Sequence, residues 1–500
     1  MNVNAKLRIA NPWWKSQDEI EEDESIVQWE KSPLKYDPRI RHTFNYSEDI
    51  IYSLRGPRQV GKTTLIKLQI RDFLRRGVSP WNVMYYSFDL EKSPEDVVDV
   101  IRSYQTLTRV QRNPTRTFFF LDEITSVREW QRGIKWLWDS GLLRKTTVVA
   151  TGSQSMDVKA SSERLPGRRG TTNDPLDKII LPMKFAEYVE VLDPKLREIL
   201  GTDFLRYAPR LEMLSKLRQG KLDKRLKSLL SYVGELNQHL HEYTLTGGIP
   251  KVVNEFRTKG VIEERIYTTY LNSILGQLTL LGKEETFVKQ LGGRILANLL
   301  WPVSWRNLQR DTDVGSVNTA INYITTLRDM FILTITYQFG EAKKVPRIEQ
   351  EKRIRFHDPF FLHVMNGWVN SKSSFELSEE FSENPTNQGA LVEGIVADHL
   401  IRLAFLLSPK KQTFDYSNCV FNWKYGGSNE LDFVLYDGDR LELPIDLKFQ
   451  NKISKKTDLN GIYNFQKATG VRMGLLLTKD EMDTTSSYAM IPTSMFLLLA

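Results

Sequence analysis

The chain lacks the features that mark secreted and membrane-spanning proteins. It has one cysteine in 500 residues, Cys419, so no disulfide can form within the chain. Its longest apolar runs, such as 118–121 and 496–499, are far shorter than the roughly 20 residues that a membrane helix needs. The N-terminus shows no basic start followed by an apolar stretch, where a secretory signal would stand. We therefore expect a cytoplasmic protein with no membrane insertion.

Histidine clusters with metal-ligand spacing and repeats of solenoid length are also lacking. What is present is ordinary globular composition, with 41% hydrophobic and 26% charged residues. Single cores stop growing at roughly 250 to 300 residues, so the length predicts several domains. The net charge is +7 although residues 17–24 are strongly acidic, which makes a polyanionic partner such as DNA plausible. Charge alone does not decide this, because mixed Lys and Glu surfaces are usual.

The order of patterns along the chain predicts a multidomain α/β protein. Short apolar runs alternate with helical patterns after residue 48, which indicates a parallel sheet flanked by helices. We expect six regions: an N-terminal arm at 1–48, a P-loop core at 49–190, a helical region at 191–283, a winged-helix domain at 284–366, a polar linker at 367–388, and a second α/β domain at 389–500.

A phosphate-binding loop follows the first expected strand. The segment has the GxxxxGK[ST] spacing and consists of Gly56, Pro57, Arg58, Gln59, Val60, Gly61, Lys62, Thr63 and Thr64. The glycines permit a tight loop whose backbone N–H groups and following helix N-terminus face phosphate oxygens. Lys62 would reach the β- and γ-phosphates of ATP, and Thr63 would hold Mg²⁺. The loop therefore predicts ATP and Mg²⁺ as cofactors.

A second element turns a nucleotide site into a candidate hydrolase. The apolar run 117–121 ends in Asp122 and Glu123, as expected of a buried strand that delivers acids at its C-terminal edge. Asp122 would bind the Mg²⁺ shell, and Glu123 would polarise the attacking water. The next strand ends in Thr151, Gly152 and Ser153, which fit either a γ-phosphate sensor or a tight turn.

Two arginines lie in a turn after the core strands. Arg168 and Arg169 could stabilise transition-state charge, in cis or from a neighbouring subunit of a homo-oligomer. They fit equally well as solvated arginines or as arginines that face a nucleic acid.

A helical unit followed by strands occupies 284–340, in the order of a winged helix. The segment 316–328 would be the recognition helix, with Ser316 as its N-cap. Its partly outward positions would be Asn318, Thr319, Asn322 and Tyr323, and its wing would carry Lys343, Lys344 and Arg347. These side chains could contact DNA, but such a unit can also serve only to pack domains together.

Acids near the C-terminus follow the order of a PD-(D/E)xK nuclease. Asp446 and Lys448 are two apart, so on a strand they share a face, while Asp432 belongs to the preceding strand. Asp432, Asp446 and an upstream Glu393 would hold Mg²⁺ or Mn²⁺, and Lys448 would orient water. The alternative is an exposed sheet edge with charges on one face.

Together these segments resemble one prokaryotic, largely archaeal family of AAA-like P-loop ATPases. The resemblance rests on GPRQVGKTT, FLDEI, TGSQS, LPGRRG and ILPMKFAEYVE, and on TGGIP, IRFHDPFF and GALVEGIVADHL later in the chain. It implies a winged helix and a C-terminal restriction-endonuclease-like domain.

These features leave several functions open. The first is an ATP-dependent DNA-processing ATPase, with Mg²⁺-dependent endonuclease activity as a second activity to be tested. The second is an ATP-switched regulator whose C-terminal domain only binds nucleic acid or a protein partner. The third is a chaperone-like or signalling ATPase that needs no nucleic acid.

Overall fold

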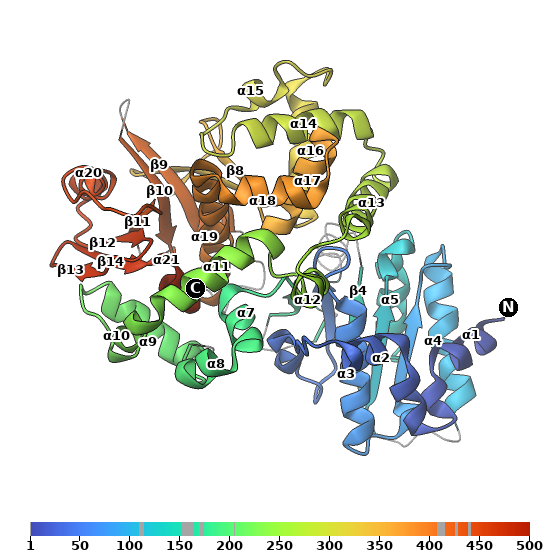
Figure 1. Ribbon diagram of the computed structural model, residues 1–500. Helices are drawn as coiled ribbons and strands as arrows, with labels where there is room; N and C mark the ends of the chain where they lie inside the picture. Colours follow the sequence, from blue (N-terminus) through green and yellow to red (C-terminus); the bar gives the residue numbers. More distant parts are fainter. Residues whose placement is uncertain are drawn as a thin grey trace. The chain divides into compact units, whose positions relative to one another are not determined.

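The protein is described from a computed structural model (Figure 1). The residues it describes are 2–109, 115–152, 165, 167, 169–170, 175–204, 206–407, 416–425, 429–438 and 442–500. They divide into two compact units, one ending at Leu181 and the other beginning at Pro182. Among the described residues, no helix has the length and apolar character needed to cross a membrane.

Unit 1 contains a five-stranded parallel sheet among its described residues. The strands are β1 (Ile51–Arg55), β2 (Val83–Ser87), β3 (Thr117–Asp122), β4 (Thr146–Thr151) and β5 (Asp177–Ile179). The helices are α1 (Val3–Ala10), α2 (Glu24–Lys31), α3 (Lys62–Arg75), α4 (Pro94–Thr108) and α5 (Trp130–Asp139). Short 3₁₀ turns are η1 (Pro12–Trp14), η2 (Gln17–Glu22), η3 (Arg39–Thr43), η4 (Pro80–Asn82) and η5 (Ile124–Ser126).

Helices cover both faces of this sheet. The strand order β2-β3-β4-β1-β5 places α3 on one face and α4 and α5 on the other when each crossover is right-handed. The aromatic side chains of β3 show both faces, because neighbouring residues of a strand point in opposite directions. Phe118 packs against Phe73 of α3 at 4.4 Å, and Phe119 packs against Tyr104 of α4 at 5.1 Å, between ring centroids. β3 is therefore a fully buried central strand, as its apolar run predicts.

The N-terminal arm packs on the edge strand of the sheet. The Asn11 side-chain amide donates to the carbonyl oxygen of Tyr85 at 2.9 Å, and the Tyr85 N–H donates back to Asn11 Oδ1 at 2.7 Å. The indole N–H groups of Trp13 and Trp14 donate to the carbonyl oxygen of Val83 at 3.1 and 3.0 Å. Side chains of the arm thus hydrogen-bond to backbone groups of β2 that an uncovered sheet edge would present to other chains.

The acidic run and α2 pair with a basic stripe on α3. Asp23 contacts Lys67 at 3.0 Å, and Glu21 contacts Arg75 at 2.9 Å, from carboxylate oxygen to side-chain nitrogen. Arg71, between them on the helix, contacts Glu30 of α2 at 2.7 Å. Because Lys67, Arg71 and Arg75 recur every four residues, they lie on one side of the helix. Two acids of the run 17–24, Glu21 and Asp23, are therefore matched by cations of α3.

Unit 2 begins with helices and ends in a mixed sheet. Its helices up to the first strand are α7 (Phe185–Leu192), α8 (Pro194–Leu200), α9 (Tyr207–Leu217), α10 (Lys224–Ser228), η6 (Leu230–Tyr232), α11 (Val233–Thr246), α12 (Pro250–Lys259), α13 (Glu264–Leu280), α14 (Glu285–Ala297), α15 (Trp305–Gln309) and α16 (Val317–Asp329). The later helices are α17 (Pro359–Asn370), α18 (Ser374–Glu383), α19 (Pro385–Leu407), η7 (Tyr416–Asn418), α20 (Asn460–Thr469) and α21 (Thr493–Leu499). The strands are β6 (Leu333–Gly340), β7 (Val345–Arg347), β8 (Arg353–Phe356), β9 (Val420–Tyr425), β10 (Asn429–Tyr436), β11 (Glu442–Lys448), β12 (Gly474–Thr478), β13 (Asp483–Thr484) and β14 (Tyr488–Pro492).

One sheet crosses the boundary at which we expected two separate domains. Strand β6 pairs antiparallel with β8 and parallel with β9, through Tyr337 with Phe421 and Gln338 with Asn422. The described strands of this sheet follow the order β13-β14-β12-β11-β10-β9-β6-β7. The hairpin of the expected winged helix and the C-terminal strands therefore belong to one sheet (Figure 1).

The segment expected as a linker contains helix α18. Its polar residues Ser374, Ser378 and Ser382 are buried and recur every four residues, so they form one face. The helix lies close to α17, because a Cβ atom added at Gly367 would come within 2.5 Å of the Ser374 hydroxyl oxygen. Small side chains on both helices allow this approach, and the serines are packing residues.

Candidate functional site

The P-loop joins β1 to α3 at the C-terminal edge of the parallel sheet. Gly61, the residue before the helix, has φ of 101°, a conformation that favours glycine. A Cβ atom at Gly56 would lie 2.2 Å from the carbonyl oxygen of Ile180, so that position leaves no room for a side chain. Both glycines of the motif are thus needed for the course of the loop.

Lys62 is buried within the loop that it follows. Its ammonium donates to the carbonyl oxygens of Gly56 and Pro57 at 3.0 and 2.9 Å. Burial lowers the pKa of Lys62, while the negative charges of Glu123 and Asp122 act to raise it. Phosphate oxygens could replace the two carbonyl oxygens and would supply the negative charge that this buried ammonium favours.

The strand acids meet the P-loop helix. The Thr63 hydroxyl donates to Asp122 Oδ2 at 2.8 Å, and the Thr151 hydroxyl donates to Asp122 Oδ1. The backbone N–H of Glu123 donates to Thr151 Oγ1 at 3.2 Å, and Glu123 has φ of 50°. Hydroxyl and carboxylate oxygens are the hard ligands that Mg²⁺ takes. The residues present therefore fit a magnesium ion beside a nucleotide phosphate.

One residue at this site was missed from the sequence. The Tyr85 hydroxyl, from β2, donates to Asp122 Oδ2 at 3.0 Å, the same oxygen that accepts from Thr63. Burial raises the pKa of Tyr85, and the Asp122 charge raises it further, so the phenol keeps its proton. No sequence motif identifies Tyr85, because its role depends on the pairing of β2 with β3.

Of the two candidate arginine fingers, only Arg169 is among the described residues. Arg168 lies outside the described residues. The Arg169 guanidinium contacts Asp177 at 3.1 Å and donates to the carbonyl oxygen of Leu176 at 3.0 Å and to that of Ile51 at 3.2 Å. Ile51 begins β1, whereas the P-loop follows the other end of that strand. The structure therefore does not bring Arg169 to the phosphate loop of its own chain.

The C-terminal acids form a second cluster, within unit 2. Lys448 Nζ lies 3.0 Å from Asp446 Oδ1, and the N–H of Leu447 donates to Asp432 Oδ2 at 3.0 Å. Burial raises the pKa of Asp432, but the Arg353 and Lys448 charges outweigh it and bring that pKa to about 2. Burial and the neighbouring Asp432 charge raise the pKa of Asp446 well above its usual value. Asp432 is thus the more acidic member of the pair, and Asp446 is the one that holds a proton more tightly.

Glu393, the third acid, is bound to two arginines of β8. Arg353 Nη1 lies 2.9 Å from Glu393 Oε1, and its Nη2 lies 3.5 Å from Asp432 Oδ1. Arg355 also donates to Glu393 through Nε, at 3.0 Å. Among the described residues, no three His, Cys, Asp or Glu side chains are placed to hold a metal ion. A three-carboxylate metal site is therefore not assembled here.

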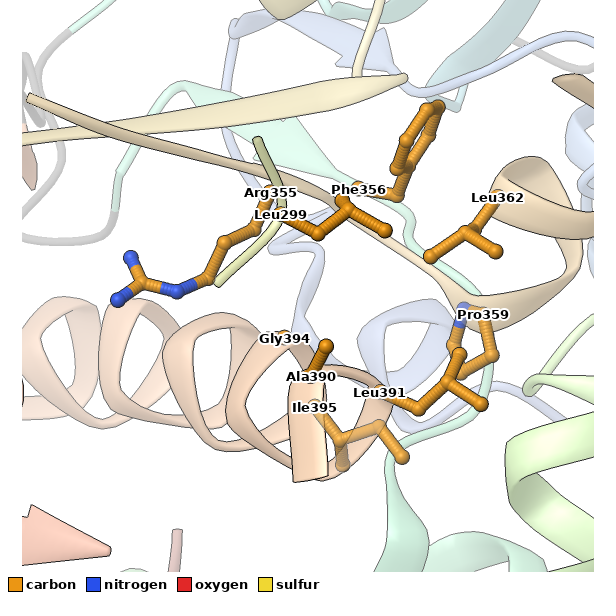
Figure 2. A pocket seen from close by; sticks show the side chains of 9 residues that line it. All are labelled: Leu299, Arg355, Phe356, Pro359, Leu362, Ala390, Leu391, Gly394 and Ile395. Atoms are coloured by element: carbon orange, nitrogen blue, oxygen red, sulfur yellow. The ribbon is translucent and has the colours of Figure 1, made fainter. Parts of the chain in front are cut away.

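A small cavity beside Arg355 is too small for a ligand. It has a volume of about 10 Å³, roughly that of one water molecule. Its lining is mostly apolar and includes Leu299, Phe356, Leu362 and Leu391. Figure 2 shows the Arg355 side chain extending away from these side chains.

The expected recognition helix is α16, and its outward residues differ in part from the prediction. Asn318 and Asn322 are exposed, but Tyr323 is buried. The Tyr323 hydroxyl accepts from the N–H of Glu284 at 2.9 Å, which ties α16 to the start of α14. On the wing, Lys344 contacts Glu442 of β11 at 2.6 Å. The wing is thus held on the C-terminal strands.

Comparison with known proteins supports the assignment of the first unit. Residues 48–189 match the family model of the AAA domain. The prediction of an AAA-like P-loop ATPase core with a parallel sheet is thereby confirmed, whereas the winged helix and the nuclease-like domain stay predictions.

Similar proteins extend beyond the AAA domain. Uncharacterized protein MJ1637 of Methanocaldococcus jannaschii is 23% identical over 484 residues, covering 94% of this chain and 90% of that protein. Uncharacterized protein MJ1544 of the same organism is 21% identical, covering 81% and 79%.

Solved structures resemble this chain only weakly, with low TM-scores. The Walker-type ATPase PABY2304 of Pyrococcus abyssi has a TM-score of 0.38 and 14% identity, covering 70% of this chain and 95% of its own. RuvB of Thermotoga maritima has a TM-score of 0.25 and 17% identity, covering 64% and 89%. These scores are low, and we draw no inference from them.

Proposed function

We propose that the protein is an ATPase whose nucleotide state governs an action on DNA. The observation that carries the ATPase is the meeting of Thr63 and Asp122 at 2.8 Å beside the buried Lys62. These groups come from a helix N-terminus and an adjacent strand end, where an AAA domain binds its nucleotide.

The roles of the residues follow from their positions. Lys62 and the loop N–H groups bind the β- and γ-phosphates, while Thr63 and Asp122 hold Mg²⁺. Mg²⁺, when bound, neutralises charge that develops on the phosphate oxygens. Glu123 accepts a proton from the attacking water and orients it, and Thr151 fixes both the Asp122 carboxylate and the Glu123 backbone.

The ATPase is tested by two variants that separate binding from hydrolysis. Lys62→Ala should abolish ATP binding, because it removes the cation that faces the phosphates. Glu123→Gln should retain ATP binding and lose hydrolysis by roughly 100-fold or more, since the amide cannot accept the proton. Hydrolysis that survives in Lys62→Ala would refute the assignment.

DNA is the proposed partner of unit 2. The order α14, α15, α16, β6, β8 is that of a winged helix, with the Val303–Lys352 bridge in place of its first strand pair. The exposed amides of Asn318 and Asn322 can bond to phosphates or base edges. A gel shift at low salt that weakens in Asn318→Ala/Asn322→Ala supports DNA binding. Unchanged mobility and unchanged ATP turnover with DNA favour a regulator of a protein partner or a signalling ATPase.

A second activity, metal-dependent DNA cleavage, is proposed for the pair Asp432 and Asp446 with Lys448. The contact of Lys448 with Asp446 on one strand favours it, and Glu393 is not included because two arginines bind it. Incubation of single-stranded, duplex and branched DNA with Mg²⁺ or Mn²⁺ tests this activity. Intact DNA, or cleavage unaffected by Asp446→Ala, rules it out.

A homo-oligomer is the proposed source of the transition-state arginine. Arg169 is bound to Asp177, away from the P-loop of its own chain. A neighbouring subunit would then supply the cation, as arginine fingers do in trans. ATP turnover per subunit should rise with protein concentration. A rate per subunit that is independent of concentration, from a species that sediments as a monomer, contradicts this proposal.

A further inference from the structure

We propose that the N-terminal arm is a working part of the magnesium site, which it positions through Tyr85. Tyr85 is then a positioning residue for Asp122, and residues of the arm set its place. This inference rests on the proposed ATP hydrolysis and adds to it a segment outside the residues that match the AAA domain.

The first step is the contact between Tyr85 and Asp122. Asp122 is 2% exposed, and its Oδ2 accepts from both the Tyr85 and the Thr63 hydroxyls, at 3.0 and 2.8 Å. Two donors on one oxygen, with Thr151 on the other, fix the plane of the carboxylate. Groups that orient a metal ligand in this way typically change metal affinity by about 10- to 100-fold when they are removed.

The second step is the hold of the arm on the Tyr85 backbone. Asn11 pairs with both the N–H and the carbonyl oxygen of Tyr85, at 2.7 and 2.9 Å. Trp13 and Trp14 bind the carbonyl oxygen of Val83, two residues earlier on β2. The arm therefore fixes the part of β2 from which the phenol reaches Asp122.

The third step is a cation on the Tyr85 ring. Lys67 Nζ lies 3.7 Å from the centroid of that ring and 5.3 Å from the centroid of the Trp13 ring. Lys67 is one helical turn after Thr63, and its ammonium is bound to Asp23 of the arm at 3.0 Å. A cation over an aromatic face is attracted to it, more strongly where water is excluded. Asp23 thus holds Lys67 on the ring, and the ring is held beside Asp122.

These contacts form one continuous path from Asp23 through Lys67 and Tyr85 to Asp122. Any event that lifts the arm, such as binding of a partner to it, would loosen the Asp122 carboxylate without touching the P-loop. The effect would fall on Mg²⁺ rather than on the nucleotide itself, because Asp122 is the group that faces the metal.

The test measures binding of a fluorescent ATP analogue at increasing Mg²⁺, so that it reads the metal site without hydrolysis. Tyr85→Phe should raise the Mg²⁺ concentration for half-maximal effect about tenfold, and should leave metal-free nucleotide binding unchanged. The matched control is Tyr104→Phe, on α4. It removes a phenol hydroxyl that donates to the carbonyl oxygen of Trp81 at 2.7 Å. The control should titrate like the wild type.

The arm is tested separately by Asp23→Asn. This variant should shift the Mg²⁺ titration in the same direction, by several-fold, and should add nothing further when combined with Tyr85→Phe, since both act on one path. A wild-type titration in Tyr85→Phe, or fully additive effects in the double variant, overturns the proposal. Failure of the proposed ATPase has a different signature: the Lys62→Ala variant would then bind the nucleotide as well as the wild type does.

Discussion

Asp122 in unit 1 and Glu393 in unit 2 are both buried acids that sequence motifs nominate as magnesium ligands, yet their partners differ in kind. The hydrogen bonds that the described residues give Asp122 come from hydroxyls of Thr63, Tyr85 and Thr151. Glu393 is bound by the guanidinium groups of Arg353 and Arg355. Neutral donors orient a carboxylate and leave its charge to attract a cation, whereas arginines cancel that charge. The groups around a carboxylate therefore decide whether an acid that a sequence motif singles out can bind a metal ion.

The largest effect should follow from removing the charge that unit 1 keeps available. Asp122→Asn preserves the size of the side chain but weakens the hold on Mg²⁺, and we expect ATP turnover to fall roughly 1000-fold, or about 4 kcal/mol in barrier height. Steady-state ATPase assays over a range of Mg²⁺ measure it. Glu393→Gln is the comparison and should leave turnover near wild type. Equal losses in both variants would break the contrast.

Stability should show the reverse pattern. Glu393→Gln removes the counter-charge of the buried Arg355 and leaves Arg353 only its longer contacts with Glu430 and Asp432. Breaking such a buried pair costs about 3 kcal/mol or more. Denaturant unfolding followed by signals from unit 2 measures the loss. Glu376→Gln, at an exposed position on α18, serves as the control. An unfolding midpoint equal to that of the control would show that the arginines do not depend on Glu393.

Removing an arginine should make the second cluster more like the first. Arg353→Met frees one side of Glu393 and the Asp432 oxygen that it faces, and we expect Mn²⁺ to bind about tenfold more tightly. Calorimetric titration with Mn²⁺ alone measures the change. Arg347→Met, on the exposed wing, provides the matched control. If both variants bind Mn²⁺ as the wild type does, Arg353 is not what excludes the metal.

The smallest expected effect concerns the proton on Asp446. Because the pKa of Asp446 is raised, the native carboxyl holds its proton more tightly than the unfolded chain does, which costs stability at pH values above 3.8. Asp446→Asn mimics the protonated form and should stabilise unit 2 by about 1 kcal/mol near neutral pH. The advantage should shrink as the pH falls towards 3.8, the usual pKa, where the unfolded wild type also holds the proton. Thermal midpoints of both proteins across this range decide it. A difference that is constant across this range would contradict a raised pKa of Asp446.

The sequence predicted those parts of the sites that depend on neighbouring residues. The P-loop and the end of the buried strand at Asp122 are short contiguous patterns, and the structure brings them together at one sheet edge. Tyr85 and Arg353 escaped notice because their partners lie 37 and 40 positions away. Nothing local in the sequence indicates that the side chain of Arg169 turns to Asp177.

Polarity alone also misled the prediction of exposure. The serines of α18 suggested a linker, yet they are buried, and Ser374 is the small residue that lets α18 approach α17 at Gly367. Tyr323 was expected outward from helical periodicity, but its hydroxyl has a backbone partner at the start of α14. In both cases tertiary packing assigned an interior role to side chains that usually face solvent.

The pairing of β6 with β9 has a mechanical consequence. Backbone hydrogen bonds join the hairpin that follows α16 to the sheet whose strands carry Asp432 and Asp446. A force that moves the hairpin therefore also acts on those strands. If α16 binds DNA as proposed, a movement of α16 against β6 would reach the strands that carry the acidic cluster. DNA contact by α16 and any chemistry at the acidic cluster would then be aligned by the shared sheet rather than joined by a flexible linker.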